Sequence, residues 1–479
     1  MMKRAMMSLW AAGALGAAST LALIPAGCAA DAPSPSQPDA DLAVDILKET
    51  VALRTAKGYG QTPAMAEALA ARLKSAGFSD DDIDMPSMEI DGEQVSALVV
   101  RYKGDGDEAP IALLAHMDVV DANPDTWGTE PFTPTVKDGY LYGRGAVDNK
   151  AGIGALITTF MRLKREGWTP DRDLVIAFSA DEETGMQTTR MLTQHEWVRD
   201  AEFALNSDAG TGSVAPDGSD PTFSIQSAEK TYATYFVTAR NTGGHSSAPR
   251  PDNALFDIAG AIKAIEALRF PVEFNDITRS MTRNLAETQE PAVRDALLTL
   301  LETPDDAEAR LVVEQSDARA HFLSTTCAPT MLSAGSAENA LPQRAMLTVN
   351  CRIMPGTSPA AVQEVLERTI NNDAIDIELN GEPVESPVSP VREDLFASIE
   401  AAVKIHHPDA KIQPTMSSGG TDGREFRRAG IPTYGAGSIT LIRPTDFRAH
   451  GIDERAPLET YKNQLVFWET LFKDIAGDA

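Results

Sequence analysis

Apolar residues in the first half of the chain form short unbroken runs, and stretches with helical spacing lie between them. The runs that indicate strands are residues 97–100, 111–115, 174–178 and 203–205. Between the second and the third run, residues 151–165 place their apolar side chains on one helical face. Strands that are apolar throughout and alternate with helices predict an α/β domain, in which helices cover a mostly parallel sheet on both faces.

The pattern changes after about residue 222. The chain now predicts a long aromatic-bearing strand, a helix, a polar helix-prone stretch, two strands, a capped helix and a last strand, at residues 231–240, 253–268, 275–320, 325–332, 345–353, 358–370 and 375–379. This order is typical of an α+β unit with one solvated sheet face. The α/β pattern of the first half of the chain resumes with a predicted helix at residues 394–406 and ends with one at 458–472.

These changes predict two domains, as the length of 479 residues also suggests. The first domain comprises residues 41–228 and 387–479, and a smaller domain, 229–386, is inserted between its two parts as a lid. Residues 1–30 are predicted to be a signal peptide, because a basic start precedes an Ala-rich apolar run that is too short for a membrane span. The Pro- and Ser-rich residues 31–40 are predicted to be a linker.

The signal peptide predicts export, with a periplasmic location. Its end, Ala26-Gly27-Cys28, is similar to a lipoprotein cleavage site, except that Pro25 stands where such sites usually carry Leu. Three alternatives fit this segment. Cys28 is acylated and tethers the protein to a membrane, here the outer membrane, or the chain is cleaved near Ala30 without a lipid, or the segment stays uncleaved as an anchor. The net charge of −28 argues against a nucleic-acid partner, because phosphates would be repelled.

Export permits disulfides, and two cysteines remain once Cys28 is set aside. Cys327 and Cys351 are each 12 positions from Asn339, so a hairpin centred there would place them opposite each other. A cross-strand disulfide and two half-buried free thiols both fit this pattern, since a register error of one residue would separate them.

Candidate catalytic residues follow directly after the predicted buried strands. The segments are His116-Met117-Asp118, Gly143 to Lys150 with Asp148, Asp181-Glu182-Glu183, and Asn206-Ser207-Asp208. In α/β sheets, ligands bind beyond the carboxyl ends of the strands. An imidazole and several carboxylates that meet there are suited to two divalent metal ions and to metal-assisted hydrolysis.

With these segments in place, the chain after residue 40 resembles the co-catalytic zinc metallopeptidase family of glutamate carboxypeptidase, aminoacylase, carnosinase and succinyl-diaminopimelate desuccinylase. The resemblance rests on those four segments and on three later ones, Gly244 to Pro249, Gly419 to Asp422, and His450 to Arg455. The loop 127–132 before residues 140–145 is most similar to the carboxypeptidase and N-acyl-amino-acid hydrolase branch.

The resemblance implies two zinc ions per subunit, with cobalt or manganese as alternatives. Asp148 would bridge them, and the remaining ligands would be His116 and Asp208 for one ion and Glu183 and His450 for the other.

The resemblance also implies catalytic roles for residues beside the ligands. Asp118 would orient the imidazole of His116. Glu182 diverges from its neighbour Glu183, so it is free to act as the general base that takes a proton from water held between the metals.

In the lid, the resemblance implies that His245 stabilises the oxyanion, in cis or across a homodimer interface formed by the lid. Asn339 and Arg352 match positions that contact substrate, and Arg352 could hold a substrate carboxylate through two parallel hydrogen bonds. The region 275–320 is longer than the compact lid of the family.

We therefore expect a zinc-dependent metallopeptidase of the carboxypeptidase, dipeptidase or aminoacylase type, which cleaves peptide or N-acyl amide bonds of small substrates with a free carboxylate. The first alternative is a deacylase of N-acyl amino acids without peptidase activity. A more remote one is a non-catalytic peptide-binding protein, although such proteins usually lose the base or a ligand, and this chain keeps both.

Overall fold

The computed structural model describes residues 32–318, 320–383 and 385–477. The predictions about the signal peptide, its cleavage and the lipid on Cys28 lie outside these residues. Residues 34–479 form one compact unit. Among the described helices, none is both long and apolar enough to cross a membrane.

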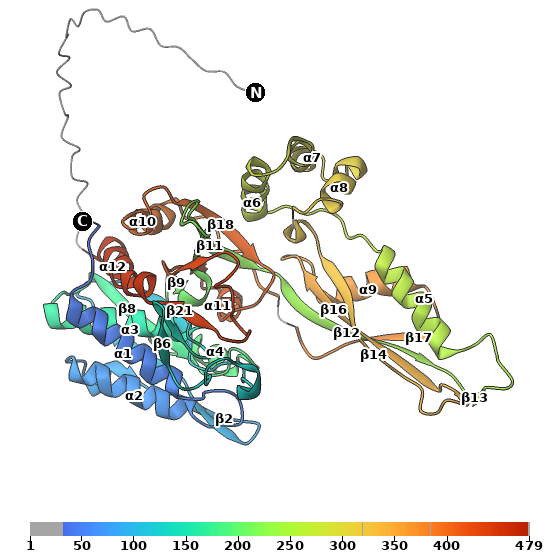
Figure 1. Ribbon diagram of the computed structural model, residues 1–479, viewed down its shortest axis with the longest axis horizontal. Coiled ribbons are helices and arrows are strands. Elements are labelled where there is room, and N and C mark those ends of the chain that lie inside the picture. Colours follow the sequence, from blue (N-terminus) through green and yellow to red (C-terminus); the bar gives the residue numbers. More distant parts are fainter. Residues whose placement is uncertain (1–31, 319, 384, 478–479) are drawn as a thin grey trace, which may run out of the picture. The chain divides into compact units, whose positions relative to one another are not determined.

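The central sheet has six strands in the order β1-β4-β8-β5-β9-β19 (Figure 1). Their bounds are β1 Ile83–Asp84, β4 Leu98–Tyr102, β5 Glu108–His116, β8 Arg172–Ser179, β9 Phe203–Asn206 and β19 Thr433–Gly435. The strands β8, β5, β9 and β19 run parallel, and β1 and β4 join antiparallel at one edge. Because the parallel strands end at the same edge, the residues that follow β5, β8 and β9 gather there.

Both faces of this sheet are buried, as the unbroken apolar runs predict. Leu113 and Ile176 belong to the core cluster under α1, α2, α3 and α12, whereas their neighbours Leu114 and Val175 belong to the cluster under α4 and α11. These helices are α1 Gln37–Ala52, α2 Thr62–Ser75, α3 Lys150–Glu166, α4 Gln187–Leu192, α11 Gly423–Arg428 and α12 Leu458–Ile475. The α/β fold class is confirmed.

The predicted linker is too long. Helix α1 begins at Gln37, so the last four linker residues, 37–40, are helical. The side chain of Ser36 caps the helix by accepting a hydrogen bond from the Asp39 backbone. Asp39 and Ala40 are buried. The Pro- and Ser-rich composition predicted a linker, but Ser36 and Asp39 in this stretch form the cap of a helix.

A second sheet, of four strands, leads the chain from the first region toward the lid. Its order is β18-β11-β10-β20, with bounds β10 Gly212–Val214, β11 Thr222–Glu229, β18 Lys411–Ser417 and β20 Thr440–Ile442. A single residue, Lys230, separates β11 from the first lid strand. We call the predicted first domain, residues 41–228 and 387–479, the body. Its other elements are β2 Ser87–Ile90, β3 Glu93–Ser96, β6 Thr135–Lys137, β7 Tyr140–Tyr142, β21 Arg455–Pro457, α10 Glu393–Lys404 and the 3₁₀ turns η1 Asp80–Asp82, η2 Pro124–Thr126 and η3 Ser207–Ala209.

The lid sheet is antiparallel throughout, in the order β14-β16-β12-β17. Its strands are β12 Thr231–Arg240, β14 Thr326–Ala334, β16 Arg344–Ile353 and β17 Ile375–Leu379. Buried and partly exposed residues alternate along β16, because one face packs under α5 Ala254–Ala267 and α9 Pro359–Ile370 while the other stays open. The short pair β13 Gly244–His245 and β15 Ala340–Leu341 forms a separate two-stranded ribbon.

The helix-prone region 275–320 folds into three helices. They are α6 Asp276–Glu287, α7 Pro291–Glu302 and α8 Ala307–Glu314, and the turn η4 His321–Leu323 follows them. They have their own hydrophobic cluster around Leu297 and Leu300. The side chain of Asn284 in α6 donates a hydrogen bond to Gln413 of β18 at 2.7 Å, so this insert also contacts the body. The domain boundaries at residues 228/229 and 386/387 stay predictions.

The two cysteines of the lid form a disulfide. Cys327 in β14 and Cys351 in β16 are directly opposite partners in the strand register. The hairpin centred near Asn339 is therefore confirmed, and of the two alternatives the disulfide is the one that the structure contains.

Candidate active site

His116 is the last residue of β5, and its ring is fixed by the turn that follows it. Its Nδ1 donates a hydrogen bond to the backbone carbonyl of Asp118 at 2.9 Å. In the neutral imidazole, this bond leaves Nε2 unprotonated and able to bind a metal ion. The side chain is 1% exposed, so it has no freedom to turn away.

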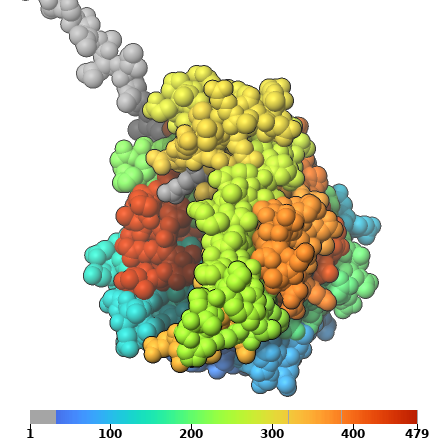
Figure 2. All heavy atoms as spheres, turned by 90° about the vertical axis from the view of Figure 1, so that its right-hand side faces the viewer, coloured from blue at the N-terminus to red at the C-terminus, as the bar shows by residue number. Residues whose placement is uncertain are grey.

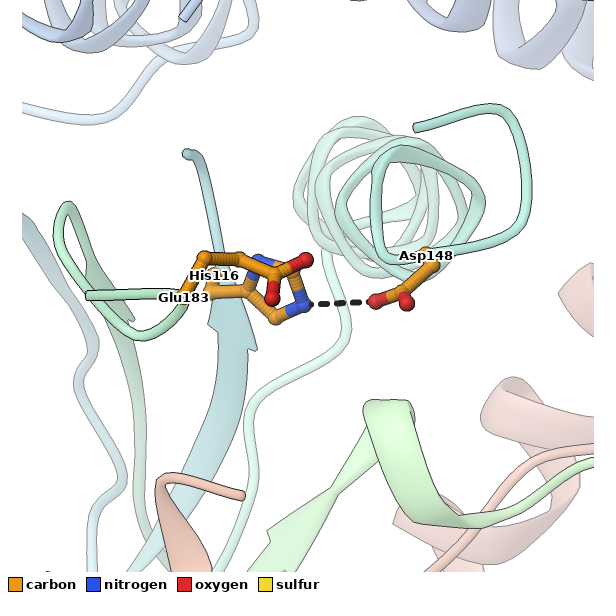
Figure 3. A group of neighbouring side chains, drawn as sticks. All are labelled: His116, Asp148 and Glu183. Atoms are coloured by element: carbon orange, nitrogen blue, oxygen red, sulfur yellow. Dashed lines mark hydrogen bonds and ion pairs between the residues drawn. The ribbon is translucent and has the colours of Figure 1, made fainter. Parts of the chain in front are cut away.

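Asp148, directly before α3, lies between two histidines. Its Oδ1 is 2.9 Å from Nε2 of His116, and its Oδ2 is 3.2 Å from Nε2 of His450. Figure 3 shows the carboxylate of Asp148 facing the ring of His116, with Glu183 beside that ring. Ligand atoms of His116, Asp148 and Glu183 all lie within 4.8 Å of one another. A carboxylate with one oxygen toward each of two imidazoles has the geometry of a bridge.

The other two ligand candidates divide between these histidines. Oε1 of Glu183 is 2.9 Å from Nε2 of His450. Oδ1 of Asp208 is 3.8 Å from Nε2 of His116. Asp208 lies in η3, the turn after β9, where the side chain of Asn206 accepts a hydrogen bond from its backbone. The structure thus brings all five predicted ligands together around Asp148, with Glu183 near both His116 and His450. Their division between two metal ions stays a prediction.

The backbone of His450 supports this arrangement. Its φ is 60°, in the left-handed region that residues other than glycine rarely adopt. Such a conformation costs free energy and persists where surrounding contacts hold it, which is common at functional sites.

Mutual contacts shift the pKa values of these groups in opposite directions. Hydrogen bonds to Asp148 and Glu183 raise the pKa of His450 to about 10. Burial acts to raise the pKa of Asp148, but its contacts with His116 and His450 outweigh burial and lower that pKa. Burial raises the pKa of Asp208, and repulsion by the charge of Asp148 raises it further. Such a concentration of carboxylates around two imidazoles is stable when positive charge is supplied, which is what divalent cations do.

Glu182, the predicted base, is held at the same strand end. The carboxylate of Asp118 accepts the backbone N–H groups of Glu182 and Glu183, both at 3.0 Å. Burial raises the pKa of Glu182 well above its usual range. A carboxylate with a raised pKa accepts a proton more readily near neutral pH.

The contact of Asp118 with His116 differs from the expected one. Its carboxylate Oδ1 is 3.8 Å from Nδ1 of His116, and its backbone carbonyl makes the hydrogen bond to the ring. The side chain is instead used to fix the segment that carries Glu182 and Glu183. The sequence could not show which oxygen of Asp118 faces the imidazole.

Two buried carboxylates near the site have no role in the sequence prediction. Glu454 accepts hydrogen bonds from the backbone of Gly145, Val147 and Asp148 and from the side chain of Arg144. It therefore fixes the loop that presents Asp148. Asp422 accepts hydroxyl hydrogen bonds from Ser179 and Thr189, and burial raises its pKa to about 7.

Both residues lie inside segments that carry the family resemblance, Gly419 to Asp422 and His450 to Arg455. That membership was the one signal in the sequence that could have marked them.

The predicted lid residues fall into two groups. Arg352 stacks over the ring of Tyr232, 4.7 Å from its centroid, and donates a hydrogen bond to the carbonyl of Ser418 at 2.7 Å. It thus reaches the glycine-rich segment 419–422. His245 lies on the β13–β15 ribbon, where its Nδ1 contacts Ser247 at 2.8 Å, and Asn339 directly precedes β15. Among the described contacts, none joins His245 or Asn339 to the metal-ligand candidates.

This donor set fits two divalent cations. Each group has one imidazole nitrogen and carboxylate oxygens, and Asp148 belongs to both, which is the ligand chemistry of a catalytic rather than a closed, cysteine-rich structural site. The fold and the site together define a metallohydrolase.

Comparison with known proteins agrees with that class. The family model of Peptidase family M20/M25/M40 matches residues 112–474. The chain belongs to this metallopeptidase family.

Curated relatives include hydrolases and peptidases. The human N-fatty-acyl-amino acid synthase/hydrolase PM20D1 is 29% identical over 396 residues, which cover 81% of this chain and 78% of the relative. A probable succinyl-diaminopimelate desuccinylase from Staphylococcus aureus is 26% identical, with 82% and 90% covered.

Solved structures show the same fold. The M20 metallo-carboxypeptidase Sso-CP2 from Sulfolobus solfataricus has a TM-score of 0.67 at 18% identity, and the alignment covers 90% of this chain and 98% of that one. A dinuclear metal-binding M20 peptidase from Bacillus subtilis has a TM-score of 0.57 at 12% identity, with 92% and 99% covered.

Proposed function

We propose that the protein hydrolyses the amide bond of N-acyl amino acids and small peptides that carry a free carboxylate. The observation that carries this proposal is the position of Asp148, whose two carboxylate oxygens face different histidines at 2.9 and 3.2 Å. Relatives named as N-fatty-acyl-amino acid synthase/hydrolase support an acyl substrate, and relatives named as carboxypeptidases support a peptide.

The site residues divide the reaction between them. When bound, two metal ions, zinc in our proposal, acidify water and polarise the scissile carbonyl. Glu182 takes a proton from the attacking water as the new C–O bond forms, and passes it to the leaving nitrogen as the C–N bond breaks. The products are a carboxylate and an amine. His245 would stabilise the oxyanion, and Arg352 would hold the free carboxylate of the substrate.

The base is tested by Glu182→Gln, which keeps the shape of the side chain and removes its proton affinity. We expect kcat to fall by about a thousandfold, within the usual range for a general base, while two metals per chain are retained. The same substitution at the exposed Glu196 is the matched control. Full turnover by Glu182→Gln with full metal content would disprove the assignment.

Substrate class is tested on the wild type with three compounds of one amino acid: its N-acyl derivative, the C-terminal amide of that derivative, and a dipeptide. We expect the amide to be a poor substrate, because it lacks the carboxylate. Hydrolysis of the N-acyl compound alone would favour the alternative, a deacylase without peptidase activity. Tight binding of all three without cleavage would favour the non-catalytic peptide-binding protein.

We also propose that the protein is exported and tethered through a lipid on Cys28. The support is the sequence at residues 3–30 alone. Labelling of cells with a radioactive fatty acid should mark the wild type, and Cys28→Ala should lose the label. An unlabelled wild type that is found soluble in the periplasm would support simple cleavage.

A homodimer through the lid is a further proposal. β14 is an edge strand of the lid sheet, and Met331 and Leu332 on it are 70% and 55% exposed. Exposed apolar edge strands are suited to pairing with another chain. Met331→Glu should convert a dimer to a monomer in light scattering. A wild type that is already monomeric would exclude this interface.

A further inference from the structure

A cavity in the lid lies apart from the metal-ligand candidates. It has a volume of about 720 Å³ and lies between α5, α7, α8 and the start of β14. Figure 2 shows α7 and α8, in yellow, next to α5, in yellow-green, on one face of the protein. The cavity separates the hydrophobic cluster of the lid sheet from that of the three-helix insert. Its volume is in the range that holds small organic ligands.

The floor of this cavity is apolar. Its buried apolar lining residues come from both clusters and are Ile265, Phe270, Val272, Leu300, Val313 and Leu323. None of these side chains has a polar atom, so the floor offers dispersion contacts and no hydrogen bonds. A flexible aliphatic chain matches such a surface, because its burial removes apolar area from water on both sides.

The rim of the cavity carries two arginines and two glutamates, which pair unequally. Arg269 and Arg310 both contact one carboxylate, that of Glu314, with Nε–O distances of 3.2 and 2.7 Å. The other acidic lining residue, Glu266, is paired with Lys263 on its own helix. The three groups Arg269, Arg310 and Glu314 therefore leave one net positive charge, which suits a monoanionic head group.

One wall of the cavity is fixed in place. The carbonyls of His321 and Ser324 both accept hydrogen bonds from Nζ of Lys230, which is 2% exposed. Thr325 accepts a hydrogen bond from the backbone of Met354 at 3.0 Å, and Cys327 is held by the disulfide. A wall with these anchors does not collapse into the space, so the site is preformed.

We propose that this cavity binds a long unbranched aliphatic carboxylate, with the chain on the apolar floor and the carboxylate at Arg269 and Arg310. The choice of this chemistry rests in part on the proposed function, since an N-acyl amino acid and its acyl product share a chain and a carboxylate. The binding itself requires no hydrolysis. The experiment therefore uses full-length protein stripped of metals, in which loss of activity does not affect the result.

Calorimetry with dodecanoate is the primary measurement. We expect one binding site per chain in the metal-free protein, and about tenfold weaker binding for each pair of methylenes removed from the probe. Titration with N-dodecanoylglycine then tests which ligand the cavity accepts. If this compound also binds, the cavity takes the intact acyl amino acid as well as the free acid. Binding of either compound in the absence of metals supports the proposal.

Ile262→Trp tests the chain position, since Ile262 is half-buried on α5 and lines the cavity. It should weaken dodecanoate binding at least tenfold. The matched control is Leu255→Trp on the same helix, at a 42% exposed position outside the cavity lining, which should bind as the wild type does.

Arg269→Gln tests the head group, and it serves as the deciding variant if Ile262→Trp fails to fold. It should weaken dodecanoate binding by about fivefold and leave dodecanol binding unchanged, because only the first probe carries a charge. Three results would overturn the proposal: no dodecanoate binding to metal-free wild type, undiminished binding to folded Ile262→Trp, or equal effects of Arg269→Gln on both probes.

Discussion

The catalytic body and the lid bury their sheets in different ways, and this difference separates their contributions to the site. In the body, β5 and β8 are buried on both faces near their carboxyl ends, so the residues that follow them are fixed from two sides. In the lid, β16 alternates between buried and partly exposed positions, and one sheet face stays open. The body can therefore hold metal ligands rigidly, whereas the lid presents side chains such as Arg352, which reaches Ser418, from a sheet with one open face.

The comparison leads to an expectation about kinetics. Body variants should abolish the chemical step, because they disturb groups that act in the transition state. Lid variants other than those of His245 should weaken substrate binding or lid stability and leave the chemistry intact. The predictions below test this division, from the largest expected effect to the smallest.

Asp148→Ala should have the largest effect. It removes the one carboxylate that contacts both His116 and His450, at 2.9 and 3.2 Å, and so should prevent binding of both metals. We expect kcat to fall by more than about a thousandfold, because two metals supply several kcal/mol of transition-state stabilisation. Elemental analysis after gel filtration measures the metal content. Asp105→Ala, at an exposed position, is the control. Retention of two metals by Asp148→Ala would contradict the bridging role.

Arg352→Lys tests the lid in the same assay. Lysine keeps the charge but cannot make two parallel hydrogen bonds to a carboxylate. We expect KM to rise by about 10- to 100-fold with little change in kcat, and a substrate without the carboxylate should not respond. Arg344→Lys, at an exposed position of the same strand, is the matched control. A fall in kcat at constant KM would place Arg352 in the chemical step instead.

The different burial of the two sheets also explains what the sequence could predict. Unbroken apolar runs located β5, β8 and β9, and the residues directly after them proved to meet. In the lid, the aromatic-bearing run 231–240 located β12 and the strand-like run 345–353 located β16. Counting from Asn339 gave the register that pairs Cys327 with Cys351. Local patterns of this kind are visible in a single chain, because side-chain periodicity follows from backbone geometry.

Contacts between distant segments could not be predicted in this way. Glu454 supports Asp148 across a separation of 306 residues, and Asp422 reaches Ser179 across 243. The choice between the carbonyl and the carboxylate of Asp118 depends on the local turn rather than on residue type. The apolar cavity under α7 and α8 arises from how two clusters pack, which no periodicity reveals.

Removal of the lid disulfide should lower stability and spare activity. The bond closes a loop with a sequence separation of 24 residues, and loops of this length contribute about 3 kcal/mol by restricting the unfolded chain. We expect the Cys327→Ala, Cys351→Ala double variant to unfold at lower denaturant concentration with kcat within about twofold. A reducing agent should destabilise the wild type and have no further effect on the variant. A large loss of kcat would show that lid order matters to the chemical step.

Lys230, the single residue between β11 and β12, gives the smallest predicted effect, and it tests the junction of the two regions. Burial lowers its pKa to about 8, below the usual value of 10.5. Between these values the unfolded chain binds more protons at this residue than the folded one, so stability should rise with pH from about 8 to 10.5. Below pH 8, both states are protonated and the penalty is constant.

The contribution of Lys230 to the pH dependence of stability is isolated by comparing the wild type with Lys230→Met. Their difference in unfolding free energy should change by about 1 kcal/mol per pH unit in that window, in favour of the wild type as pH rises. Lys103→Met, at an exposed position, should give a flat difference and is the control. A flat difference for Lys230→Met would mean that the amine reaches water. The carbonyls of His321 and Ser324 would then not be its partners in solution.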